Sequence, residues 1–76
     1  MDTKTYTITH FINGGETIEE RDYEATSVSE ALTMAERAEA GQRTVTFGIQ
    51  PRDYDEALAE GVAFNEADGL LVDAHE

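Results

Sequence analysis

The chain has 76 residues, 17 of them acidic and 5 basic, with a formal net charge of −12 and no cysteine. This length suits one small domain (residues 1–76), and the lack of cysteine excludes disulfides and thiolate metal sites. The negative charge argues against direct binding to nucleic acid or to an anionic membrane, and no stretch resembles a signal peptide or membrane span, so we expect a soluble cytoplasmic protein.

A β-hairpin is predicted at the start of the chain. Apolar and polar residues alternate from Lys4 to Ile12, and many of them are β-branched, which is typical of a strand. The following Asn13-Gly14-Gly15 supplies the positive φ angles that a tight turn requires. We therefore expect a return strand from about Glu16 to Ala25.

A two-residue Gly-Gly loop fixes the register of this hairpin. Positions that face each other then sum to 29, which sets Tyr6 opposite Tyr23 and His10 opposite Glu19. Successive strand side chains point to opposite faces. The register thus places three acids on the face of the threonines, away from the tyrosines: Glu20, Asp22 and Glu24.

A helix and a third strand are predicted next. Ser27 and Glu30 form a capping box, in which the Glu30 side chain reaches back to the amide of the cap, and Gly41 supplies a left-handed stop. The apolar stripe of this helix consists of Val28, Ala31, Leu32, Ala35 and Ala38. The range Thr44–Gln50 alternates again, with Val45, Phe47 and Ile49 facing inward.

The last third of the chain predicts a second, short helix. Asp53 and Glu56 repeat the capping pattern, and Gly61 ends the helix. Residues 62–72 are then compatible with a hairpin around Asp68-Gly69 or with a helix that continues through Phe64. The predicted fold class is α+β, a small β-β-α-β sheet with the capped helix on one face, the short helix and a possible C-terminal hairpin.

Catalytic and metal-binding chemistry have few candidate residues. The two imidazoles are His10, which we expect to form a hydrogen-bonded pair with Glu19, and His75 near the C-terminus. Neither has the setting of a general base, so we expect a non-enzymatic protein. Asp53 and its acidic neighbours suit a first helical turn better than a calcium loop. We predict no cofactor and no dedicated metal site.

The acidity itself points to a binding function. Residues 53–76 carry eight acids and no Lys or Arg. Alternate residues of a strand lie roughly 6.6 Å apart, about two steps of the roughly 3.4 Å charge spacing along one DNA strand. Carboxylates held at this spacing could occupy a basic groove built for phosphates. The predicted binding residues are Glu20, Asp22, Glu24, Asp53, Asp55, Glu56, Glu60, Glu66 and Asp68.

Two alternatives stay open at this point. The charge could serve only solubility, as in a salt-adapted protein, and would then be spread evenly over the surface. A small ligand-binding protein that uses His10 is the other alternative. The sequence is equally compatible with a monomer and with a homodimer formed through the hairpin edge.

One segment resembles a known functional group. The stretch Glu24-Ala25-Thr26-Ser27-Val28-Ser29-Glu30-Ala31 lies between the predicted hairpin and an Ala-rich helix. It resembles the β-β-α-β core of small type I anti-CRISPR proteins from phages and mobile elements, and the Glu-Ala-x-Ser-x-Ser-x-Ala spacing is similar to one type I-F inhibitor. The resemblance implies an inhibitor in a bacterial host cell that binds a Cas subunit of a type I CRISPR surveillance complex and blocks DNA access.

Overall fold

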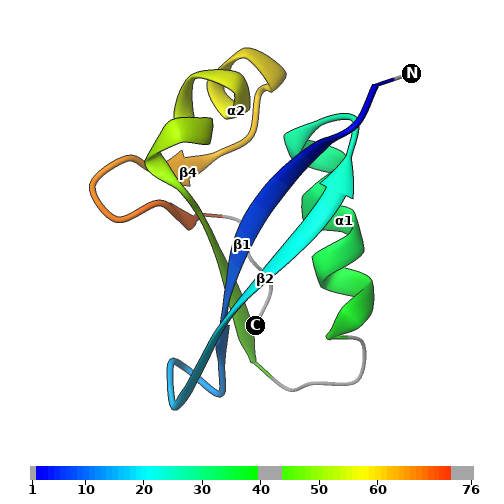
Figure 1. Cartoon of the computed structure of the whole chain (residues 1–76). Coiled ribbons are helices and arrows are strands. Elements are labelled where there is room, and N and C mark those ends of the chain that lie inside the picture. The colour runs from blue at the N-terminus through cyan, green and yellow to red at the C-terminus, as the bar shows by residue number, and fades with distance from the viewer. Residues whose placement is uncertain (1, 40–43, 73–76) are drawn as a thin grey trace.

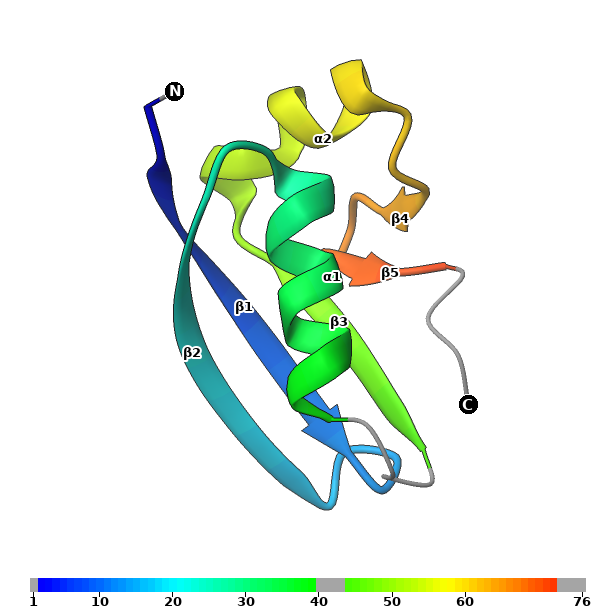
Figure 2. The same cartoon turned by 90° about the vertical axis from the view of Figure 1, so that its right-hand side faces the viewer.

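The structure, a computed structural model, describes residues 2–39 and 44–72. In chain order its elements are β1 (Lys4–Ile12), β2 (Thr17–Ala25), α1 (Val28–Ala38), β3 (Val45–Ile49), η1 (Pro51–Asp53), α2 (Tyr54–Glu60), β4 (Phe64–Asn65) and β5 (Leu70–Leu71). The strands form an antiparallel sheet in the order β2-β1-β3-β5-β4. Helix α1 lies across one face of the long strands, and α2 lies beside the first turn of α1 (Figures 1 and 2). The predicted α+β class is confirmed.

The register of the β1–β2 hairpin is confirmed. Tyr6 lies opposite Tyr23 and His10 opposite Glu19. The loop differs from the prediction, because it spans the four residues 13–16 and begins with Asn13, whose φ is 57°. The Asn13 amide donates to the carbonyl of Thr44 at 2.7 Å. The backbone amide of Asn13 thus bonds toward β3. The last residue pair of the hairpin is Ile12–Thr17, one pair before the Asn13–Glu16 pair that a two-residue loop requires.

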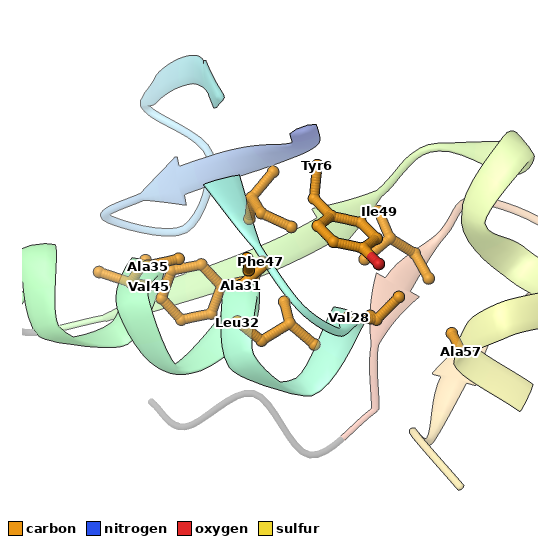
Figure 3. Packing of buried hydrophobic residues seen from close by; sticks show 11 residues of the cluster. Tyr6, Val28, Ala31, Leu32, Ala35, Val45, Phe47, Ile49 and Ala57 are labelled. Carbon is orange, nitrogen blue, oxygen red and sulfur yellow. The ribbon is translucent and has the colours of Figure 1, made fainter. Parts of the chain in front are cut away.

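The core lies between α1 and the sheet. The side chains of α1 that it buries are Val28, Ala31, Leu32 and Ala35. Phe47 and Val45 of β3 pack against this stripe, and Tyr6 and Ile49 continue the core toward α2 (Figure 3). Ala38 was expected in the stripe but is exposed. The predicted stop at Gly41 lies outside the described residues.

The N-terminus of α1 is capped largely as predicted. The Ser27 hydroxyl accepts a hydrogen bond from the amide of Glu30 at 3.1 Å. The Glu30 carboxylate reaches one residue further back than expected and accepts from the amide (2.6 Å) and the hydroxyl (2.8 Å) of Thr26. These bonds favour the charged form and lower the pKa of Glu30.

The C-terminal third forms the predicted short helix and a hairpin. Helix α2 ends at Gly61, which adopts the left-handed conformation with φ 83°. The alternative of a helix through Phe64 is therefore wrong, and Phe64 instead pairs with Leu71 across a small hairpin. Strand β5 joins this hairpin to the main sheet through the pair Gly48–Leu70.

Candidate protein-binding surface

The acids of β2 form a row on the sheet face opposite α1. Glu20, Asp22 and Glu24 are all exposed and alternate with Arg21 and Tyr23, which point toward the helix side. Asp22 accepts a hydrogen bond from the Thr7 hydroxyl of β1 at 2.8 Å. Because the strand fixes the backbone, the three carboxylates leave one face at regular intervals of roughly 6.6 Å.

Few cations lie close to this row. Within residues 2–39 and 44–72, the Lys and Arg ion pairs are Lys4–Glu56, Arg21–Glu19 and Arg21–Glu39, and none includes the row. Arg52 reaches the row only indirectly, because its guanidinium donates at 3.3 Å to the Thr7 hydroxyl that in turn donates to Asp22. The row therefore keeps its negative charge largely uncompensated within the described part of the chain.

Glu56 of α2 is used inside the fold. It accepts a hydrogen bond from the Tyr6 hydroxyl at 2.5 Å and forms an ion pair with Lys4 at 3.2 Å. The hydrogen bond to Glu56, reinforced by burial of the phenol, raises the pKa of Tyr6 to about 12. This carboxylate ties α2 to the start of β1.

Glu60 caps the other helix. Its two carboxylate oxygens accept from the amides of Val28 (3.0 Å) and Ser29 (2.9 Å), at the N-terminus of α1. These are amides that a helix leaves unpaired. Burial raises the pKa of Glu60, but the hydrogen bonds from Ser29 and Val28 together outweigh it and the net shift is downward.

Asp53 is buried and Asp55 is exposed. Asp53 precedes α2 but makes no side-chain cap, contrary to the predicted capping pattern. Its Oδ2 atom has no hydrogen-bond partner among the described residues, and burial raises the pKa of this carboxyl. The 3-10 turn η1, which begins at Pro51, brings the chain into α2 and turns Asp53 inward.

The remaining two predicted residues lie in the loop between β4 and β5. Glu66 and Asp68 are exposed there, and the Asp68 carboxylate accepts from the amide of Leu70 at 3.0 Å. In Figure 1 this loop lies on the side of the strands away from α1. The structure therefore separates the nine predicted acids into the regular row on β2, three acids used inside the fold around α2 (Asp53, Glu56 and Glu60), the exposed Asp55, and the loop pair.

A buried polar cluster involves His10, with partners other than the expected one. The fully buried His10 ring lies with Nδ1 2.7 Å from Glu39 and Nε2 2.9 Å from the Tyr23 hydroxyl. Arg21 lies 3.3 Å from Glu39 and also binds Glu19, a bond that raises the pKa of Arg21. The predicted His10–Glu19 pair is therefore wrong.

The His10 cluster has the geometry of a structural tie. A carboxylate only accepts, so His10 donates from Nδ1 to Glu39, and Nε2 lies within hydrogen-bond distance of the Tyr23 hydroxyl. Both ring nitrogens are thus occupied inside the fold, which leaves neither for a substrate. Within the described ranges, no three His, Asp or Glu side chains are close enough to hold a metal ion.

Comparisons with known protein families, with curated proteins and with solved structures find no match for this chain. In the part of the chain that the structure describes, neither helix has the length and apolar character needed to cross a membrane.

Proposed function

We propose that this protein is a non-enzymatic inhibitor that binds a basic DNA-binding surface of another protein by imitating the charge of DNA. The acidic row of β2, defined as Glu20, Asp22 and Glu24, carries this proposal. These carboxylates are exposed, evenly spaced and held by a paired strand, and no Lys or Arg of the described residues forms an ion pair with them. Such a row presents negative charge to a groove lined by Lys and Arg.

The acids around α2 have a different role in this proposal. Glu56 and Glu60 hold α2 against β1 and α1, and Asp53 is buried. We therefore place the contact on the acidic row, with Asp55, Glu66 and Asp68 as exposed charges that add to the long-range attraction.

The target class follows from the resemblance of residues 24–31 to type I anti-CRISPR proteins. Under this proposal, the partner is a Cas subunit of a type I CRISPR surveillance complex, and the inhibitor occupies the surface that receives target DNA. A surface that binds phosphates through Arg and Lys would bind carboxylates through similar charge-assisted hydrogen bonds.

Capture from a bacterial lysate at low ionic strength tests the proposal. The immobilised protein should retain basic DNA-binding proteins that duplex DNA elutes. The variant Glu20→Gln/Asp22→Asn/Glu24→Gln should retain little of them. The control Asp2→Asn/Glu16→Gln/Glu36→Gln neutralises three exposed acids elsewhere and should behave as the unmodified protein. Equal capture by the two variants would contradict a role for the acidic row beyond net charge.

A further inference from the structure

In residues 2–39 and 44–72, strand β2 is a long edge strand of the sheet. It has nine residues, and within the described part of the chain β1 is its one neighbouring strand. A free edge presents unpaired amide and carbonyl groups, which pair readily with an added strand. Figure 1 looks toward this edge, with β2 in front of β1.

The hydrogen-bond pattern identifies the outward-facing groups. In an antiparallel sheet, the amide and carbonyl of a residue point to the same side, and this side alternates along the strand. The Asn13 amide donates to Thr44 beside β3, so odd-numbered residues of β1 bond to β3 and even-numbered ones to β2. The even-numbered residues of β1 face odd-numbered residues of β2. The groups left at the free edge belong to Ile18, Glu20, Asp22 and Glu24.

The acidic row thus supplies both charge and backbone. Its side chains line the open face, and its amides and carbonyls point out of the edge. A strand added there continues the sheet, and its alternate side chains lie beside the row at about 4.5–5.5 Å between opposite Cβ atoms. Opposite charges at such positions stabilise the pairing, and like charges oppose it.

We propose that the β2 edge binds an extended segment of its partner by antiparallel strand addition, and that this segment carries Lys or Arg at alternate positions. The proposal rests on the proposed function, because it uses the same acidic row, and adds the binding mode and the chemistry of the partner segment. Main-chain hydrogen bonds supply affinity in such complexes, and alternate side chains supply specificity.

A second copy of the chain fits this edge poorly. The outward groups belong to even-numbered residues, so in an antiparallel pair of β2 edges even-numbered residues face one another. Acids of the row then lie opposite acids, for example Glu20 opposite Asp22 of the partner copy. Each copy also carries a formal net charge of −12, which adds repulsion over longer distances.

The test uses the peptide acetyl-Thr-Lys-Thr-Lys-Thr-Lys-Thr-amide and amide hydrogen exchange measured by NMR. With the peptide at about ten times its Kd, exchange at Glu20, Asp22 and Glu24 should slow about tenfold. Amides of Arg21 and Tyr23, already bonded to β1, should change little. If exchange at these amides slows as the protein concentration rises in the absence of the peptide, two copies of the chain pair through this edge, and the proposal is overturned.

Two methylated peptides separate strand addition from simple charge attraction. In an antiparallel pair, residues opposite the row direct their amides to β2, so N-methylation of the lysines should abolish binding. N-methylation of the threonines, whose amides point away, should leave it intact. Suppose that all three peptides bind the unmodified protein equally and that none binds the Glu20→Gln/Asp22→Asn/Glu24→Gln variant: this result overturns strand addition and leaves charge mimicry standing. Peptide binding that the triple variant does not weaken contradicts both strand addition and charge mimicry.

Discussion

The His10 imidazole lies 2.7 Å from the carboxylate of Glu39, which joins the middle of β1 to the residue that ends α1. Both side chains are buried, and Arg21 approaches the same carboxylate oxygen at 3.3 Å. A carboxylate at a helix C-terminus is opposed by the helix dipole. His10 and Arg21 offset this unfavourable interaction with the dipole, and their contacts with Glu39 hold the end of α1 against the sheet.

Replacing Glu39 by Ala should destabilise the fold. The variant leaves the Nδ1–H donor of buried His10 without its partner, a loss of about 2 kcal/mol in the free energy of unfolding. Urea denaturation measures this as a lower midpoint at unchanged slope. Glu36→Ala, one turn earlier and exposed, is the matched control and should shift the stability by less than about 0.5 kcal/mol. Equal midpoints for the two variants would show that the tie contributes nothing.

Glu60→Gln should weaken the cap of α1. At neutral pH we expect a loss of about 1 kcal/mol, because a charged acceptor is replaced by a neutral amide at the Val28 and Ser29 amides. The folded pKa of Glu60 is lowered, so its stabilisation is present above the ordinary value of 4.5 and is lost as the pH falls through the folded pKa.

The difference in the free energy of unfolding between the unmodified protein and Glu60→Gln should therefore become smaller as the pH is lowered. Denaturant titrations at a series of pH values below neutrality measure it. Glu66→Gln, at an exposed position of the loop between β4 and β5, should show neither the loss nor this pH dependence. A difference that stays constant down to strongly acidic pH would argue against the charged cap.

Tyr6→Phe should change the alkaline stability of the protein. The folded pKa of Tyr6 is about 12 against an ordinary 10.0, so its stabilisation is complete below pH 10 and is lost as the pH rises toward 12. The variant should lose about 1 kcal/mol at neutral pH, with the hydrogen bond to Glu56, and should lack this alkaline decline. Thermal unfolding measured from neutral pH toward pH 12 tests this prediction. The control variant Tyr54→Phe should still lose stability as the pH rises toward 12.

Gly69→Ala should disrupt the junction of β5 with β3. Gly69 has φ 73°, and an added Cβ would lie 2.5 Å from the carbonyl oxygen of Ile49 and 2.9 Å from the Tyr54 hydroxyl. We expect a loss of about 3 kcal/mol, since backbone strain and a clash with backbone combine. Gly61→Ala has a similar φ in open space and should cost about 1 kcal/mol. Equal midpoints in urea would contradict the clash.

Local patterns in the sequence predicted much of the fold. The alternation of Lys4–Ile12 and the following turn residues were enough to place Tyr6 opposite Tyr23, because the partners of a hairpin are close in the chain. The Ser27 cap and the buried stripe of α1 likewise depend on residues within a few positions of one another. The exposed positions of the acidic row follow from that same register.

Contacts between distant segments could not be predicted in this way. Glu60 binds the amides of α1 only because the fold brings the end of α2 beside them, and no sequence spacing encodes that meeting. The same holds for Asp53. The local sequence pattern placed it at the cap of a helix, whereas tertiary packing buries its side chain. His10 was assigned to the carboxylate across the hairpin, whereas Glu39 reaches it from α1.

Competition with DNA is the most direct test of charge mimicry. The measurement is the fluorescence anisotropy of a labelled target duplex bound to a type I CRISPR surveillance complex, titrated with this protein. The unmodified protein should displace the duplex, and Glu20→Gln/Asp22→Asn/Glu24→Gln should need at least about tenfold more protein to do so. A complex that holds protein and duplex together, or equal displacement by both forms, would contradict the proposed mimicry.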